Sequence, residues 1–304
     1  MALTAESGTN FVPLFFRAFF LNAQQRLARW GLWKPEKSLA AHPLPMQHAE
    51  ILALAGLRVD GRREDDVRTV RFTIGVASQA DGSVYLEQGL NKVLVLVHGP
   101  HEPDGGGGSE DRGSLEVEVE QSAFSGTERK KRRIGDRKTA EVENIIKQTL
   151  QEVVMLELYP KSTITVVVHV LASDGSTVCA ALNAACLALM SCGISMTDMV
   201  VACSIGIVNG KVCQDLTQVE QSSGGAFLPV AIRASSEEII MMQLDQRLSL
   251  ALCETALQQA VDGCRKIRQV MDRGMRDHLR LVLLAQRGGG IGEEGEEEKA
   301  GREA

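Results

Sequence analysis

The sequence predicts one domain of mixed α and β structure, because strand-like and helix-like segments alternate from residue 57 to residue 287 without a convincing linker. The chain has 304 residues, of which 44% are hydrophobic, enough to bury one substantial core or two modest ones. The tail at 288–304 is acidic and rich in Gly and Glu, and is expected to stay disordered. The fold is therefore expected between two terminal extensions.

Residues 1–50 make up the N-terminal extension. They combine an aromatic and apolar run at 11–21 with a basic stretch that follows it. Organelle-targeting peptides are basic and amphipathic. A poorly ordered extension, or a mistaken start of the reading frame, explains the same composition, and targeting is not favoured.

The first predicted elements are strands. The strand-like stretches 68–77 and 83–99 flank Asp81-Gly82, and Asp-Gly between two such runs is typical of a hairpin turn. Apolar residues at helical spacing over 142–154 predict an amphipathic helix. The stretch 163–171 is rich in β-branched residues and predicts another strand.

The second half of the domain continues the alternation. An alanine-rich stretch from residue 177 predicts a helix. A hairpin is expected over 199–214, because Asn209-Gly210 lies at its centre. Strands at 227–232 and 239–243 follow, and apolar residues at helical spacing over 257–271 predict a long closing helix.

Charge and cysteine content restrict the possible functions. The formal net charge of −6 argues against nucleic-acid binding over the whole surface but leaves room for a local basic patch. The seven cysteines include no CxxC pair and no His at ligand spacing, so they are interpreted as reduced core residues of a cytosolic or nuclear protein, and no metal site is predicted. No apolar run reaches the roughly 18 residues that a transmembrane helix requires.

Three stretches are candidates for chemistry. The Gly-Ser-Thr turn at Ser176 and Thr177 lies between a predicted strand and a predicted helix, where free N–H groups favour an anion, although a simple helix cap explains it too. The stretch 126–138 has seven basic and two acidic residues, typical of a phosphate-tracking segment, of a solvated loop or of a nuclear-import signal. Asp215 follows a strand, where it could act as a general acid, help to hold a metal ion or cap a turn.

Taken in order, several short motifs resemble the ribonuclease PH family, and in particular its RNA exosome ring subunits. The resemblance covers residues 57 to 285. The motifs that carry it are Arg58-Val59-Asp60-Gly61-Arg62-Arg63, Gln79-Ala80-Asp81-Gly82-Ser83, Glu87-Gln88-Gly89, His98-Gly99-Pro100-His101-Glu102, Phe124-Ser125, Glu128-Arg129-Lys130, Gly193-Ile194-Ser195-Met196 and Asp215-Leu216.

This resemblance implies an α+β ribonuclease PH fold, with mixed sheets and packed helices similar to domain 2 of ribosomal protein S5. It implies a ring of related subunits, capped by proteins with OB-like and KH domains, through which single-stranded RNA passes. In active members, inorganic phosphate attacks the terminal phosphodiester at the RNA 3′ end and releases a nucleoside diphosphate. Such chemistry requires cations, a helix N-terminus for the anion, and an acid or a metal for the leaving oxygen.

Compared with the active pattern, this chain lacks two charged groups. Ser176, Thr177 and Val178 align with its glycine, serine and arginine, and valine offers no guanidinium for phosphate. Asp215 matches the catalytic acid, but Gln221 stands where active archaeal members have a second Asp near the metal. The phosphate site is therefore expected to be degenerate and the role of Asp215 vestigial.

The resemblance also raises RNA binding by the basic stretch above its alternatives. The residues expected to contact RNA are Arg112, Arg129, Lys130, Arg132, Arg133 and Arg137. The leading hypothesis is a non-catalytic exosome ring subunit that needs no cofactor, lines an RNA path to a separate hydrolytic nuclease, and works in the nucleus, nucleolus and cytoplasm without a membrane. The alternatives are an active phosphorolytic exoribonuclease that uses inorganic phosphate and Mg²⁺, and an architectural subunit without RNA contact.

Overall fold

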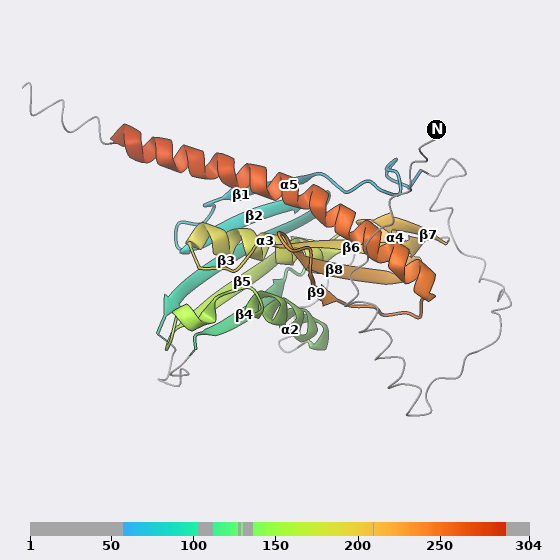
Figure 1. Cartoon of the computed structure of the whole chain (residues 1–304), viewed down its shortest axis with the longest axis horizontal. Coiled ribbons are helices and arrows are strands. Elements are labelled where there is room, and N and C mark those ends of the chain that lie inside the picture. Colours follow the sequence, from blue (N-terminus) through green and yellow to red (C-terminus); the bar gives the residue numbers. More distant parts are fainter. Residues whose placement is uncertain (1–56, 103–111, 127–128, 130–135, 209, 290–304) are drawn as a thin grey trace, which may run out of the picture. The chain divides into compact units, whose positions relative to one another are not determined.

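The computed structural model describes residues 57–102, 112–126, 129, 136–208 and 210–289. Figure 1 shows the elements in chain order. The strands are β1 (Val70–Ile74), β2 (Gly82–Gln88), β3 (Asn91–His101), β4 (Ser114–Gln121), β5 (Thr163–Ala172), β6 (Val200–Val208), β7 (Lys211–Gln214), β8 (Phe227–Arg233) and β9 (Ile239–Met242). The helices are α2 (Arg137–Gln151), a short 3-10 turn η1 (Leu156–Leu158), α3 (Thr177–Cys192), α4 (Gln218–Ser222) and α5 (Leu250–Gly289).

The strands form two sheets. The first has the order β1-β2-β3-β5-β4, in which β4 and β5 run parallel and the other pairs antiparallel. The second has the order β7-β6-β8-β9 and is antiparallel throughout. One mixed sheet and one antiparallel sheet, both packed with helices, confirm the expected α+β class.

Helix α3 lies between the two sheets and forms the centre of the core (Figure 1). It packs against β2, β3 and β5 of the first sheet and against β6 and β8 of the second. A helix that is apolar on all sides has to be buried, and its many alanines allow strands to approach closely from both directions. Helix α2 packs on β4, and α5 packs along β6, β7 and β8.

The structure corrects two details of the predicted elements. Residues 83–99 do not form one strand, because the chain turns at Gly89, which has φ +60°, and the run divides into β2 and β3. A Cβ at Gly89 would lie 2.5 Å from Cδ of Arg68, so this turn has room only for glycine. Residues 114–121 were assigned no element, yet they form β4.

The predicted helix over 257–271 is confirmed as part of the longer α5. Its Gly274 lies against the ring of Phe72 on β1, which joins the C-terminal helix to the first sheet. No helix within the described ranges is long and apolar enough to cross a membrane. Residues 288 and 289, the first two of the predicted tail at 288–304, belong to α5. The rest of that prediction and the expectations for 1–50 concern residues outside those ranges.

Candidate functional site

The turn that joins β5 to α3 is fixed from several sides. Asn91 donates from Nδ2 to the carbonyl oxygen of Gly175 at 2.6 Å and accepts the N–H of Asp174 at 2.5 Å. Gly175 has φ +71°, and a Cβ there would lie 2.6 Å from the carbonyl carbon of Thr217. Only glycine fits, because the backbone of the 216–218 segment lies directly against the turn.

The two residues expected to bind phosphate differ in exposure. Ser176 is buried and donates its hydroxyl proton to the carbonyl oxygen of Leu216 at 2.9 Å, so the hydroxyl of Ser204 is the donor in the bond between those two serines. Thr177 is half-buried, and its Oγ1 lies 2.9 Å from Oγ of Ser173. Val178 is half-buried and packs against the core. Of the two hydroxyls, only that of Thr177 lies near the surface.

Asp215, the family's catalytic acid by resemblance, is fully buried against Arg68. The Nε and the backbone N of Arg68 donate to Oδ2 of Asp215 at 2.9 and 3.0 Å, and Nη2 donates to Oδ1 at 2.7 Å. Arg68 also donates from Nη1 to the carbonyl oxygen of Asp174 at 2.7 Å. One guanidinium therefore ties the strand end at 215 to the turn before α3.

The environment of Asp215 decides its protonation. Burial alone raises the pKa of its carboxyl, but the hydrogen bonds and positive charge of Arg68 outweigh burial and hold that pKa below its ordinary value. A general acid must carry a proton to donate. In this arrangement the ionised carboxylate has an Arg68 donor on each oxygen, and the pair stabilises the fold.

A second buried arginine holds the segment that follows Asp215. Arg58 donates from Nε to Oε1 of Glu220 at 2.7 Å, pairs through Nη2 with Oε2, and donates to the carbonyl oxygen of Asp215 at 2.8 Å. Glu220 in turn forms a capping box with Thr217 at the start of α4. Burial opposes ionisation of Glu220, yet its bonds to Arg58 lower the pKa of the carboxyl.

We call Arg58, Arg68 and the residues they hold, 174–177 and 214–220, the arginine lock. No structural role for either arginine follows from the sequence, because each is separated by about half the chain from its partners. Within the described part of the chain, no group of three or more His, Cys, Asp or Glu residues could hold a metal ion. Gln221 lies half-buried on α4, beside the lock.

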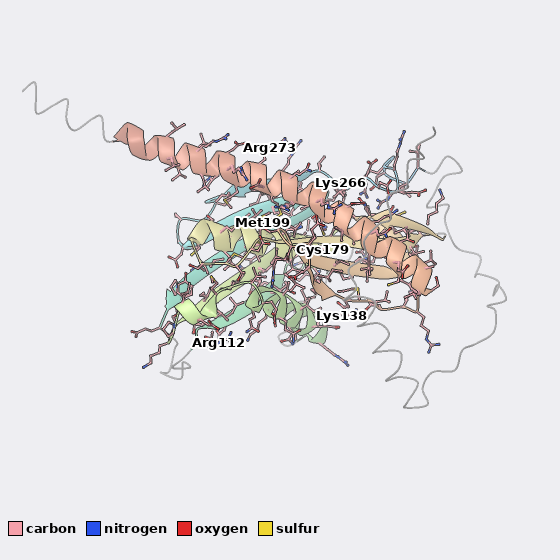
Figure 2. The ribbon with its side chains drawn as sticks, in the orientation of Figure 1. Arg112, Lys138, Cys179, Met199, Lys266 and Arg273 are labelled. Atoms are coloured by element: carbon pink, nitrogen blue, oxygen red, sulfur yellow. The ribbon has the colours of Figure 1, made fainter. Side chains whose placement is uncertain are left out.

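The arginines expected to bind RNA lie elsewhere and are exposed. Arg112 precedes β4, and its Nη2 lies 3.8 Å from Oε1 of the exposed Glu157. Arg137 is the first residue of α2. Figure 2 shows Arg112 and Lys138 toward opposite ends of α2, which has 15 residues.

Arg129 and Arg137 are exposed, and neither makes an ion pair with another described residue. Lys130, Arg132 and Arg133 lie outside the described ranges. The structure thus places three of the six predicted RNA contacts on the surface, and it does not gather them at one point.

A groove of about 940 Å³ between α2 and β9 contains Arg137 in its lining. The same lining includes Arg233 but also Glu141, Glu152 and Glu238. Three carboxylates against two guanidinium groups give an acidic balance, which does not suit a polyphosphate backbone. This groove is also distinct from the turn at Thr177.

The loop between β4 and α2 approaches the Thr177 turn. Strands β4 and β5 are parallel, so the residues that follow them meet at the same edge of the sheet. The N–H of Ser173 donates to the carbonyl oxygen of Ser125 at 2.8 Å. The site thus consists of the N-terminus of α3 and the adjoining loop, and the exposed arginines lie apart from it.

The fold and this site define a class of protein, the domain pair of ribonuclease PH-type enzymes. Residues 66–195 match the model of the 3′ exoribonuclease family, domain 1, and residues 198–263 match domain 2 of that family. The chain belongs to the 3′ exoribonuclease (ribonuclease PH) family.

Relatives and solved structures agree with this assignment. The chain is 40% identical over 241 residues to human exosome complex component RRP41, covering 79% of this chain and 98% of the relative. It is 34% identical to exosome complex component Rrp41 of Thermococcus onnurineus, covering 77% and 94%. A crystal structure of rice Rrp46 superposes with a TM-score of 0.64 at 26% identity, covering 72% of this chain and all of that one.

A structure of the Archaeoglobus fulgidus exosome with RNA bound to the active site superposes with a TM-score of 0.63, covering 71% of this chain and 92% of that one. Its identity of 24% supports the fold alone. The expected family and fold are thereby confirmed.

Proposed function

We propose that this chain is a non-catalytic core subunit of an RNA exosome ring, which supports 3′-to-5′ RNA processing and degradation by building the ring and lining its RNA path. The proposed assembly, an exosome, is inferred from relatives that are named exosome complex components. The proposed loss of catalysis is supported by one observation: the arginine lock lies beside a turn that has Val178 where active members of the family have an arginine.

Phosphorolysis requires a captured phosphate and a proton for the leaving oxygen. Val178 offers the phosphate no charge, and Asp215 offers no proton while Arg68 holds it ionised. Arg68 itself does not replace the missing ligand, because it donates to the carbonyl of Asp174 and to Asp215 and is buried. An active site would need a guanidinium from another subunit.

RNA contact is the second part of the proposal. Arg129 and Arg137 are exposed and unpaired among the described residues, and free arginines bind phosphate oxygens strongly. The partners we propose are other ribonuclease PH-like subunits, OB and KH cap subunits, a hydrolytic nuclease and single-stranded RNA. The proposed locations are the nucleus, the nucleolus and the cytoplasm, and no cofactor is required.

A phosphate-dependence assay on the assembled ring tests the loss of catalysis. The ring is incubated with single-stranded RNA, with and without inorganic phosphate and Mg²⁺, and nucleoside diphosphates are measured. We expect no phosphate-dependent release. Release that stops on Asp215→Asn, in a ring that still assembles, would establish the active alternative and refute this proposal.

A protection assay tests the RNA path. Arg129→Glu combined with Arg137→Glu should shorten or abolish the RNA fragment that the assembled ring protects from an added nuclease. Arg265→Glu, on the exposed part of α5, is the matched control and should leave the fragment unchanged. Unchanged protection in the double variant would favour an architectural subunit without RNA contact.

A further inference from the structure

Phe124 is the most exposed of the large hydrophobic side chains in the described part of the chain, with 72% of its surface accessible. It lies in the loop between β4 and α2, at 122–126. Single exposed apolar side chains are common on protein surfaces and need no function. The case for a function therefore depends on how the loop is held and what surrounds it.

The loop holds Phe124 in a fixed place. The N–H of Ser122 donates to the carbonyl oxygen of Val170 at 3.0 Å, and the N–H of Ser125 donates to that of Ser122 at 3.0 Å. Ser125 is buried, and its carbonyl oxygen accepts the N–H of Ser173 at 2.8 Å. The backbone on both sides of Phe124 is therefore anchored to β5 and to the start of the Thr177 turn, while the ring projects into solvent.

The surroundings of this ring favour an anionic ligand. Ser173, which binds the loop, also hydrogen bonds to Thr177, the first residue of α3, where helix N–H groups carry partial positive charge. Arg129 follows Phe124 by five residues, so it lies within roughly 17 Å along the chain. Arg129 is exposed and has no ion pair with a described residue.

We propose that Phe124 is a stacking platform for a base of single-stranded RNA whose backbone is bound by Arg129. This inference rests on the proposed function, and it assigns to Phe124 a contact with the face of a base rather than with a phosphate. Every base has a π-face, so the platform would tolerate any sequence. A fixed aromatic ring with an exposed arginine five residues further along the chain suits a polynucleotide better than a protein surface, which would need more apolar area around the ring.

Stacking and phosphate contact differ in their dependence on salt. We would titrate fluorescently labelled oligoadenylate and oligouridylate with the assembled ring at several KCl concentrations. Phe124→Ala should weaken binding by about 5- to 150-fold with the same slope of log affinity against log salt. Arg129→Ala should reduce the steepness of that slope by about 0.7, the value for one contact to single-stranded nucleic acid.

Two further variants give matched comparisons. Phe124→Tyr keeps an aromatic ring and should retain most of the affinity. Leu90→Ala removes another exposed apolar side chain, one that is 70% accessible on the β2–β3 turn, and should leave affinity unchanged. Equal affinities for wild type and Phe124→Ala would overturn the proposal.

A spectroscopic readout detects the stack directly. In Phe124→Trp, binding of oligoadenylate should quench the added indole fluorescence, whereas Leu90→Trp should show no such change. A Phe124→Ala chain that no longer enters the ring would identify Phe124 as a protein contact and would overturn the inference while leaving the proposed function intact. Failure of the wild-type ring to bind either oligonucleotide would overturn both.

Discussion

Arginines serve two different purposes in this chain. Arg58 and Arg68 are buried and bind carboxylates and backbone carbonyls of the arginine lock. Arg112, Arg129 and Arg137 are exposed, and of these three only Arg112 forms an ion pair with another described residue. A buried guanidinium with all its partners is a structural element, whereas an exposed one can exchange water for a phosphate. Burial and pairing, and not the number of cations, therefore decide which arginines are available to bind RNA.

The largest expected effect follows from breaking the lock. Arg68→Met keeps the length and apolar character of the side chain but leaves the Asp215 carboxylate buried without its partner. Removing one member of a buried ion pair costs about 3–5 kcal/mol. We expect a loss of this size in the free energy of unfolding, measured by urea denaturation.

Arg265→Met is the control for that loss. Arg265 pairs with Glu237 on the surface, and exposed pairs contribute at most about 1 kcal/mol. Equal losses in Arg68→Met and Arg265→Met would contradict the distinction between buried and exposed arginines.

The turn that the lock holds should be nearly as sensitive. Gly175→Ala combines left-handed backbone strain with a collision against Thr217, and we expect a cost of about 2–4 kcal/mol. Gly61→Ala is matched in backbone angle, with φ +78°, but its new methyl group meets nothing within 4 Å. It should cost only the strain, about 1–2 kcal/mol. Thermal unfolding of both variants separates collision from strain.

The pH dependence of stability tests whether buried Arg68 stabilises the charged form of Asp215. The pKa of Asp215 is lowered in the folded protein, so its stabilising contribution is fully present above the unfolded pKa of about 3.9 and is lost as the pH falls through the folded value. The stability gap between wild type and Arg68→Met should therefore be widest near neutral pH and should narrow below pH 4. A gap that stays constant from pH 7 to pH 3 would mean that Arg68 does not stabilise the charged carboxylate.

The smallest effect on stability is expected for the exposed arginines. Arg129→Ala and Arg137→Ala should each change the free energy of unfolding by less than about 0.5 kcal/mol. Each should reduce the steepness of the salt dependence of RNA binding by about 0.7. Calorimetry and binding titrations on the same preparations measure both. A large loss of stability with an unchanged salt dependence of RNA binding would mean that these arginines stabilise the fold, as Arg58 and Arg68 do.

Local patterns in the sequence predicted most of the secondary structure. The hairpin around Asn209-Gly210 and the strands β5, β8 and β9 follow from turn chemistry and β-branched runs. Strand β4 could have been predicted too, because Leu115 to Glu120 alternate between apolar and acidic residues with the period of two that marks a half-buried strand. The turn at Gly89 that separates β2 from β3 was not predicted, because it lies within a continuous strand-like run.

The candidate site was predictable only in part. The turn at Ser176 and Thr177 was located from the strand and helix on either side of it. No local pattern predicts that the hydroxyl of Ser176 donates to the carbonyl oxygen of Leu216, 40 residues away. The arginines of the basic stretch are recognisable by charge, whereas the anchoring of the loop around Phe124 depends on bonds to Val170 and Ser173 that no local pattern predicts.

Most of the order of the elements, the family, and the lack of a guanidinium at Val178 follow from the sequence alone, because each is a property of neighbouring residues or of residue type. Only the tertiary structure decided that Asp215 is locked as an anion by Arg68, 147 residues away, and that Arg129 and Arg137 remain exposed. The physical reason is that ionisation and availability depend on which charges and how much water surround a group, and folding brings those neighbours from distant parts of the chain.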